Sequence, residues 1–242
     1  SNIHETAIIY EGAEIAEDVV IGPYTVIGPQ VKIGKGTIVE SHVVIEGETY
    51  IGERNKIYSF ASIGKDSQDL KYKGEATKTI IGNNNKIREF VTIHRGTTDR
   101  WEKKIGDNNL IMAYVHVAHD CLIGNGCILA NNATLAGHVV MEDFSYVGGL
   151  TPVHQFCRIG TQAFVGGASS INQDIVPFCL AEGAKGGPRA INAIGLKRKG
   201  FSDETIKNIK EAFRIIFRSK MLLNDAVAKV EEELKKGKKS DV

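Results

Sequence analysis

The chain has 242 residues, a formal net charge of +1 at pH 7 and 42% hydrophobic residues. This length is enough for one large domain, or for one domain with an appendage, and the balanced charge gives no reason to expect nucleic acid as a partner. No apolar run approaches the roughly 20 residues of a transmembrane helix, and no charged-then-apolar signal segment opens the chain, so we expect a cytoplasmic protein.

Apolar residues recur at every sixth position along most of the chain. The series runs from Ile3 to Ile63, resumes from Ile81 to Ile93, and continues from Ile105 to Ile171. If the apolar residue is counted as the first of six, glycine often follows it, and the fifth residue is usually small or β-branched. Neither a helical period of about 3.6 nor simple strand alternation explains a period of six. The pattern predicts a parallel β-helix over residues 1–178, in which each short strand turns one apolar side chain inward.

Two polar segments interrupt the repeat, at residues 65–79 and 95–104. Loops that leave a rigid scaffold are where binding residues concentrate. We keep that possibility for the first segment and interpret the second as solvated surface.

Three of the four cysteines, Cys121, Cys127 and Cys157, occupy the fifth position of their repeats. We therefore expect small core residues with reduced thiols. A disulfide or a cysteine metal site is the weaker interpretation, because no two cysteines form a CxxC pair.

If three repeats make one coil, residues eighteen apart lie one above the other at roughly 4.8 Å, the usual strand spacing. Gly137 then lies above His119, Gln155 lies above Gly137, and His138 lies above Asp120. This stacking predicts one polar patch on about three coils, made of His116, His119, Asp120, Gly137, His138, His154 and Gln155.

Such a patch could act as a general base. A neutral imidazole oriented by a carboxylate can activate a hydroxyl near pH 7, and the amide of Gly137 could donate to an oxyanion. No serine or cysteine stands out as a nucleophile, so direct acyl transfer is the simplest mechanism. The alternatives are histidines that are merely hydrogen-bonded, or a zinc site made by His116, His119 and His138.

The pairs Gly148-Gly149 and Gly166-Gly167 are also eighteen residues apart. Bare backbone on adjacent coils would leave a trough suited to an alkyl chain. The alternative is that these glycines serve only the corners of the coil.

The repeat ends near Pro177, and residues 179–200 form a glycine-rich, basic connecting segment. A helix is predicted to begin after Ser202, a suitable N-cap, and a second helix to run from about Asn224 to Lys236. Their apolar stripes predict packing surfaces in a helical domain over residues 201–242.

The string His116-Val-Ala-His119-Asp120-Cys121, together with residues 128–139 and 153–156, resembles the UDP-N-acetylglucosamine O-acyltransferase family. Residues 68–72 and 92–97 match that family too. The resemblance implies a left-handed parallel β-helix followed by a small α-helical domain. It also implies a homotrimer, with active sites between subunits, that needs no cofactor or metal.

The implied reaction moves an (R)-3-hydroxyacyl group from acyl carrier protein to the 3-hydroxyl of UDP-N-acetylglucosamine, the first step of lipid A biosynthesis. By resemblance, His119 is the general base, Asp120 its orienting partner and Gly137 the oxyanion donor. Lys71, Arg198 and Lys199 would meet phosphate groups, Asn192 the nucleotide end, and Gly167 the end of a long acyl chain. The remaining substrate contacts would come from Gln68, Asp69, His116, His138, His154 and Gln155.

Some positions depart from the family pattern. Ile194 stands where a glutamate is common, Lys199 where a second arginine is common, and Lys185 where a histidine is familiar. Lysine cannot reproduce the fork of an arginine, which puts the contacts at the nucleotide end in doubt. A 3-amino sugar as acceptor, which would give an amide, stays open.

A basic set near the end of the solenoid could dock an acidic carrier protein, although a solvated helix face explains it nearly as well. It consists of Lys197, Arg198, Lys199, Lys207, Arg214, Arg218 and Lys220. The rival functions are the later N-acyltransferase of the same pathway, whose extra N-terminal domain has no counterpart in this sequence, a metal-dependent hydratase, and a solenoid that binds without catalysis.

Overall fold

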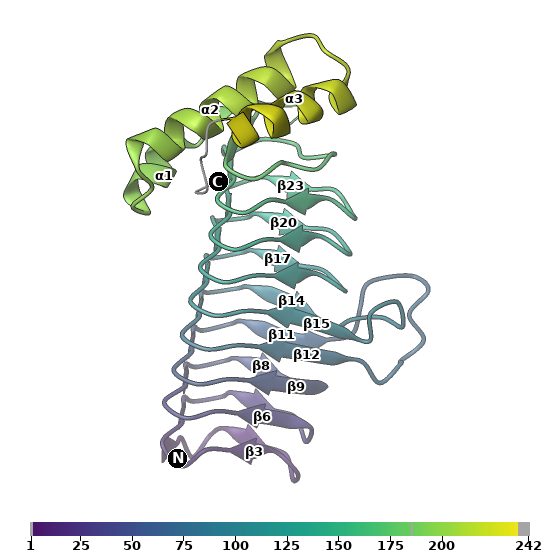
Figure 1. The fold of residues 1–242 in the computed structure, drawn as a ribbon. Coiled ribbons are helices and arrows are strands. Elements are labelled where there is room, and N and C mark those ends of the chain that lie inside the picture. The colour runs from purple at the N-terminus through teal and green to yellow at the C-terminus, as the bar shows by residue number, and fades with distance from the viewer. Residues whose placement is uncertain (1, 185, 237–242) are drawn as a thin grey trace.

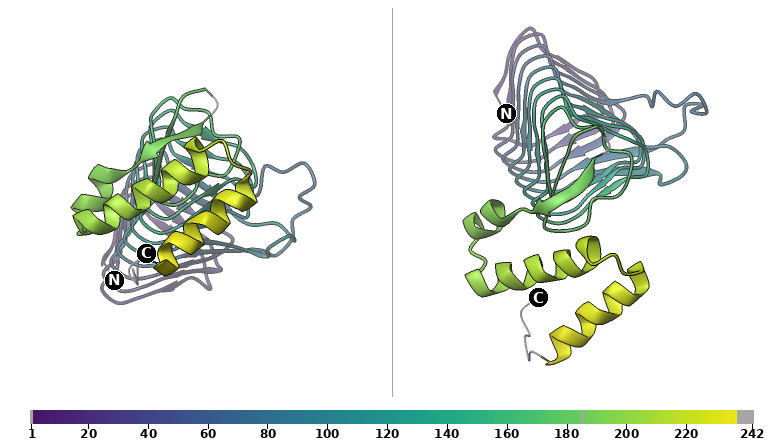
Figure 2. Two further views of the ribbon diagram at one scale, coloured as in Figure 1. Left: turned by 45° about the horizontal axis from the view of Figure 1, so that its top comes forward. Right: turned by 90° about the horizontal axis from the view of Figure 1, so that it is seen from above.

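A column of short strands carries a cap of helices in the computed structural model, which describes residues 2–184 and 186–236 (Figure 1). Within these residues the strands form three sheets, which we call A, B and C in the order in which the chain visits them. From β1 to β25, successive strands belong to successive sheets, so each full coil contributes one strand to each. Seen along its axis, the column is triangular (Figure 2).

Sheet A comprises β1 (Asn2–Ile3), β4 (Val20–Ile21), β7 (Ile38–Val39), β10 (Lys56–Ile57), β13 (Lys86–Ile87), β16 (Leu110–Ile111), β19 (Ile128–Leu129), β22 (Tyr146–Val147), β25 (Phe164–Val165), β26 (Cys179–Glu182) and β27 (Gly187–Ile191). Sheet B comprises β2 (Ile8–Ile9), β5 (Val26–Ile27), β8 (Val44–Ile45), β11 (Ser62–Lys65), β14 (Thr92–His94), β17 (His116–Val117), β20 (Thr134–Leu135) and β23 (Pro152–Val153). Sheet C comprises β3 (Glu14–Ile15), β6 (Val31–Ile33), β9 (Glu48–Ile51), β12 (Lys78–Ile81), β15 (Glu102–Ile105), β18 (Leu122–Ile123), β21 (Val140–Met141) and β24 (Arg158–Ile159).

Strand register confirms the coil of three repeats. His116 pairs with Thr134 and Val117 with Leu135, eighteen residues apart. The apolar stripe is buried from Ile21 to Ile171, as predicted. The first coil is the exception: Ile3 has 38% of its surface exposed and Ile9 and Ile15 are half-buried, because no coil covers them from below in the described chain. All four cysteines are free and buried, which confirms them as core residues.

The fourth residue of most repeats turns the corner in the left-handed region of backbone space. Asp120 has φ 56°, His138 has φ 64° and Phe156 has φ 67°. This conformation is uncommon for residues other than glycine. Backbone hydrogen bonds between coils hold it, since the N–H of His138 donates to the carbonyl of His119 and the N–H of Phe156 to that of Gly137, both at 3.1 Å.

Two loops leave the column, at residues 66–77 between β11 and β12 and at 95–101 between β14 and β15. Both leave at the corner between sheets B and C, which we call the B–C corner (Figure 2). They are shorter than the segments that the sequence assigned to loops, because Lys78 and Glu102 already pair in sheet C. Lys78 also forms an ion pair with Glu48 of the coil below, at 2.9 Å.

The strands β26 and β27 pair antiparallel as a hairpin and close sheet A. The helices α1 (Ala193–Arg198), α2 (Asp203–Arg218) and α3 (Leu223–Lys236) follow. The hairpin and α1 were not predicted, whereas the N-cap of α2 is confirmed: Ser202 Oγ accepts a hydrogen bond from Thr205 N–H at 3.0 Å. Among the described residues no helix combines the length and the apolar character needed to cross a bilayer. Lys185 lies outside the described residues.

Candidate active site

A cavity of about 700 Å³ opens at the B–C corner and gathers most of the predicted site. The turn after β17 supplies His119, the turn after β20 supplies Gly137 and His138, and the loop at 66–77 covers one side. The predicted residues that line the cavity are Gln68, Asp69, Lys71, His116, His119, Gly137, His138 and Gln155.

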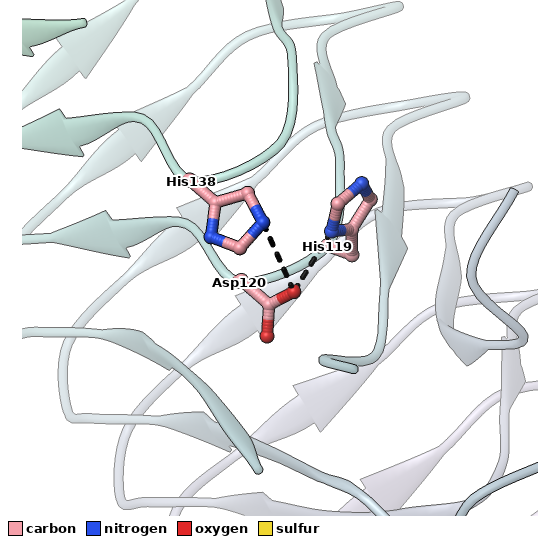
Figure 3. Close-up of side chains that lie close together, drawn as sticks. All are labelled: His119, Asp120 and His138. Atoms are coloured by element: carbon pink, nitrogen blue, oxygen red, sulfur yellow. Dashed lines mark hydrogen bonds and ion pairs between the residues drawn. The ribbon is translucent and has the colours of Figure 1, made fainter. Parts of the chain in front are cut away.

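His119 and Asp120 form a hydrogen-bonded pair. His119 Nδ1 lies 2.8 Å from Asp120 Oδ2, as Figure 3 shows. Because an ionised carboxylate can only accept, His119 Nδ1 carries the proton and Nε2 keeps its lone pair. The Asp120 side chain is fully buried, whereas 15% of the His119 side chain remains exposed. A buried carboxylate that orients an imidazole at the edge of a cavity is the arrangement a general base requires.

Thr97 holds the other side of the Asp120 carboxylate. Its N–H donates to Oδ1 at 2.9 Å and its hydroxyl to Oδ2 at 2.6 Å. Burial by itself disfavours the charge of Asp120, but the hydrogen bonds from Thr97 and His119 outweigh burial and hold the pKa of this carboxyl below its ordinary value. Asp120 is therefore ionised at neutral pH.

Thr97 belongs to the loop at 95–101, so the interpretation of that loop as solvated surface was wrong. The loop is also tied to its neighbour, since Thr77 Oγ1 donates to the carbonyl of Gly96 at 2.7 Å. The sequence did contain a signal that this loop lies next to Asp120. The interruption lengthens this coil to 24 residues, so that Thr92 pairs with His116. The same offset brings residues 96–97 beneath residues 120–121.

His138 lies above Asp120, as the stacking predicted. Its Nε2 is 3.8 Å from Asp120 Oδ2 and 3.4 Å from Asp99 Oδ2, and its ring stacks on Phe156 at 4.4 Å between centroids. Its ring also meets the His119 ring edge-on at 5.2 Å. Burial lowers the pKa of His138, although the carboxylates of Asp120 and Asp99 oppose the shift, so the ring is neutral near pH 7.

His116 and His94 form a second imidazole pair at the floor of the cavity. His116 Nδ1 lies 2.7 Å from Thr92 Oγ1, and the two rings meet edge-on at 4.9 Å. Burial, followed by the proximity of His94, lowers the pKa of His116 to about 4. His94 is buried, and its Nδ1 finds no hydrogen-bond partner among the described residues. Sequence reasoning gave His94 no role, although it lines the cavity.

Gly137 provides the surface against which the His119 ring packs. A Cβ atom at this position would overlap Cε1 and Nε2 of His119, so only glycine fits. Its backbone therefore lies beside the ring nitrogen that is not bonded to Asp120.

The N–H of Gly137 is not part of the backbone ladder. Gly137 is the third residue of its repeat, and at two other third positions the chain has a proline, namely Pro23 and Pro29. At the corner between sheets C and A, the equivalent amides donate instead to side-chain oxygens of the next coil at 2.6 to 2.8 Å, in Glu53, Asn83, Asp107 and Asn125. In the described chain the N–H of Gly137 has no such acceptor. It is free to bind an oxygen of a substrate.

The three-histidine zinc site is not formed as predicted. Donor atoms of His119, Asp120 and His138 lie within 4.8 Å of one another, but His116 is not part of this group in the described residues. Neighbouring ligand atoms around a tetrahedral zinc ion are roughly 3.3 Å apart, because zinc–nitrogen bonds are about 2.0 Å long. The 2.8 Å contact between His119 and Asp120 is a direct hydrogen bond instead.

Six predicted residues do not line this cavity: Asp120, which is buried behind His119, and five that lie elsewhere. His154 is exposed on the next coil, with Nδ1 3.1 Å from the carbonyl of Gln155. Gly167 lies at the corner between sheets A and B, over Gly149. The other three are at or near α1, at the C–A corner: Arg198, Asn192 and Lys199.

Asn192 and Lys199 make local contacts within the chain. Asn192 caps α1, since its Oδ1 accepts from Gly195 N–H at 3.1 Å and its Nδ2 donates to the carbonyl of Gln162 at 3.0 Å. Lys199 Nζ lies 4.0 Å from the centre of the Phe144 ring. Gln162 and Phe144 are corner residues after strands of sheet C, so this group occupies a different corner from His119.

Comparisons with known proteins point to one family. The family model described as "Udp N-acetylglucosamine O-acyltransferase; Domain 2" matches residues 174–241, and the bacterial transferase hexapeptide model matches residues 1–35, 12–47 and 102–137. LpxA from Acinetobacter baumannii is 48% identical with a TM-score of 0.94, over 97% of this chain and 92% of that one. The UDP-N-acetylglucosamine O-acyltransferase of Moraxella catarrhalis is 46% identical with a TM-score of 0.93, over 97% and 91%. The UDP-N-acetylglucosamine acyltransferase of Francisella novicida is 41% identical with a TM-score of 0.94, over 98% and 87%.

Proposed function

The chain belongs to the UDP-N-acetylglucosamine O-acyltransferase family, and on that premise we propose that it transfers an (R)-3-hydroxyacyl group from acyl carrier protein to the 3-hydroxyl of UDP-N-acetylglucosamine, the first step of lipid A biosynthesis. The observation that carries the proposal is the His119–Asp120 pair at the edge of the cavity, with the bare amide of Gly137 beside its free nitrogen.

The proposed mechanism is direct transfer. His119 Nε2 takes the proton of the sugar 3-hydroxyl as that oxygen attacks the thioester carbonyl of the carrier-bound acyl group. The Gly137 N–H donates to the oxyanion of the tetrahedral intermediate. When the intermediate collapses, the carbon–sulfur bond breaks and the carrier thiolate takes the proton back from His119. Asp120 holds the Nδ1 proton throughout and stabilises the imidazolium.

The sugar nucleotide would occupy the cavity between the coils and the loop at 66–77. Lys71 supplies a positive charge suited to a phosphate, and Gln68 and Asp69 lie beside it on the same loop. His116 and His138 are neutral near pH 7, so they can exchange hydrogen bonds with sugar hydroxyls without a net charge.

A homotrimer would complete the site. Arg198 and Lys199 have no route to the B–C corner of their own chain, because they lie near α1 at the C–A corner. In a three-membered ring with head-to-tail contacts, one chain presents its B–C corner to a different surface of its neighbour. The basic residues of one subunit and the histidines of the next would then bind the same substrate molecule.

The acyl carrier protein would dock on the helical cap. A groove of about 530 Å³ along α2 is lined by Arg189, Lys207, Lys210, Arg214 and Arg218, with Glu211 the acidic residue among them. Such a cationic surface attracts an acidic partner and speeds its association. Lys197 belongs to the same predicted basic set but is paired with Asp203 at 3.2 Å.

Mass spectrometry of UDP-N-acetylglucosamine incubated with 3-hydroxyacyl carrier protein and the purified chain tests the function. We expect a product heavier by one 3-hydroxyacyl group, bound as an alkali-labile ester. Formation of an alkali-stable amide with a 3-amino sugar would show that the acceptor is an amino group and not the 3-hydroxyl. Carrier binding without any product would point to a binding solenoid, and stoichiometric zinc in the active protein would favour a metal-dependent enzyme.

A further inference from the structure

Lys103 is fully buried inside the solenoid, one coil below His119 and Asp120. It occupies the fifth, inward-facing position of its repeat. Thr79 holds this position on the coil below, and Cys121 holds it on the coil above. Both neighbours are small and neutral, so a lysine is out of keeping with its position.

A short side chain satisfies this position elsewhere in the column. Thr37, Asn85 and Asn109 occupy it on other coils and donate to carbonyl oxygens of the next coil at 3.0, 2.9 and 3.0 Å. A lysine adds a charge that has to leave water. Burial lowers the pKa of Lys103 to about 8, although Cys121 and Asp120 oppose the shift. The packing of the coils does not require a cation at this position.

The length of the side chain carries its ammonium group to the strand that precedes the catalytic turn. Lys103 Nζ donates to the carbonyl of Val117 at 2.6 Å, and Val117 is two residues before His119. A hydrogen bond from a charged donor is about twice as strong as one between neutral groups. It fixes the peptide from which the turn with His119 and Asp120 starts.

The ammonium also acts on the ionisable groups that surround it. It interacts electrostatically with Asp120 and Cys121 of the coil above and with His94 and His116 of sheet B. Its charge favours the ionised form of Asp120. It also opposes protonation of both histidines, adding to the effect of their burial.

We propose that Lys103 is a positioning residue for acyl transfer: its ammonium fixes the Val117 carbonyl and balances the Asp120 carboxylate, and thereby holds His119 in the orientation that a general base needs. The inference rests on the proposed function and adds a cation inside the scaffold that touches no substrate. It explains why a buried charge is kept where a threonine would suffice.

Two variants test the proposal. Lys103→Met keeps the length and removes the charge, and Lys103→Thr installs the residue type of the coil below. Lys104→Met is the matched control, because Lys104 is the next residue on the same strand and is exposed. Turnover and KM are measured from about pH 6.5 to about pH 9.5.

Below pH 8 we expect kcat to be lower by about tenfold in both Lys103 variants, with KM and the Lys104→Met control unchanged. Above pH 8 the difference in kcat between the wild type and the Lys103 variants should become smaller, because wild-type Lys103 then loses its own proton. A merely structural role would not produce this pH dependence.

Wild-type kcat in both variants would overturn the inference, as would a loss that is the same at every pH. Thermal melting shows whether each variant folds, and one folded variant is sufficient for the test. If neither folds, Lys103 is a structural residue and the inference is wrong. A wild-type chain that transfers no acyl group contradicts the proposed function instead, whatever the Lys103 variants do.

Discussion

The carboxylate of Asp120 joins three segments that are distant in sequence. It accepts hydrogen bonds from His119 next to it and from Thr97 on the loop below, and His138 lies above it. Its backbone is in the left-handed region, so the side chain points across the corner toward these partners. The contacts of this one corner residue therefore orient the ring of His119, the proposed base.

Thr97→Val should reduce kcat by about tenfold, because the loss of a hydrogen bond to a charged group removes about 1.5 to 3 kcal/mol and part of that acts on the transition state. KM should change little, since Asp120 is fully buried. Steady-state kinetics measure the effect. Thr25→Val is the control, because it deletes a comparable buried hydroxyl, 2.7 Å from the carbonyl of Glu40 and far from the cavity. Equal kcat losses in the two variants would contradict a specific role for Thr97.

Gly137→Ala should reduce kcat by about a hundredfold, because the new Cβ would displace the His119 ring and small misplacements of a catalytic group have effects of this size. The backbone of Gly137 has no positive φ in the described structure, so folding should survive. Gly187→Ala provides a control with room for a Cβ atom. If Gly137→Ala has the kcat of the wild type, the position of the His119 ring does not depend on its contact with Gly137.

Stacking arithmetic could predict most of these residues. An offset of eighteen brings Gly137 over His119 and His138 over Asp120, which is what the coils show. Thr97 was missed because it lies in the loop that changes the offset to 24. His94 and Lys103 were missed because their roles depend on burial and on side-chain reach, which a repeat pattern does not encode.

At the scale of elements, the period of six was sufficient to predict the short strands and the apolar residues that they bury. It could not predict the hairpin of β26 and β27 or α1, because these elements have no repeat and depend on contacts with the end of the column. β26 pairs with β25, and the Asn192 cap of α1 donates to Gln162 in a corner of the last coils. A local signal was sufficient for α2, whose Ser202 cap is readable from sequence.

The glycines at the corner between sheets A and B form the second element with a predicted role. A Cβ at Gly167 would lie 3.3 Å from the carbonyl oxygen of Gly149, and the φ of Gly167 is not positive, so a side chain there requires the backbone of Gly149 to shift by a few tenths of an ångström. Gly167→Met should shift the preferred donor toward shorter acyl chains, because the new side chain would fill the end of the trough. Competition among donors of different lengths measures the preference. An unchanged profile would show that the acyl chain does not lie there.

For the whole molecule, the triangular column separates its functional groups by corner. The histidines occupy the B–C corner, where both loops leave the column (Figure 2), the paired glycines lie at the corner between A and B, and Lys199 with α1 lies at the C–A corner. A single chain thus keeps the predicted phosphate contacts of Arg198 and Lys199 apart from its base. Assembly of several chains is the simplest way to unite them.

Mixed oligomers test this assembly. His119→Ala and the double variant Arg198→Ala/Lys199→Ala should each be nearly inactive alone. When the two are co-expressed with different tags and purified through both, one of the three sites in each ring joins the intact halves, and activity should return to about one third of wild type. Mixed oligomers no more active than their parents would show that each site lies within one chain.

The most direct test of the proposed chemistry is the turnover of His119→Ala at saturating concentrations of both substrates. Loss of a positioned general base should lower kcat by about a thousandfold. The melting temperature should stay close to that of the wild type, because His119 lies at the edge of the cavity and outside the apolar core. A folded His119→Ala enzyme that turns over within tenfold of the wild type would contradict the assignment of His119 as the base.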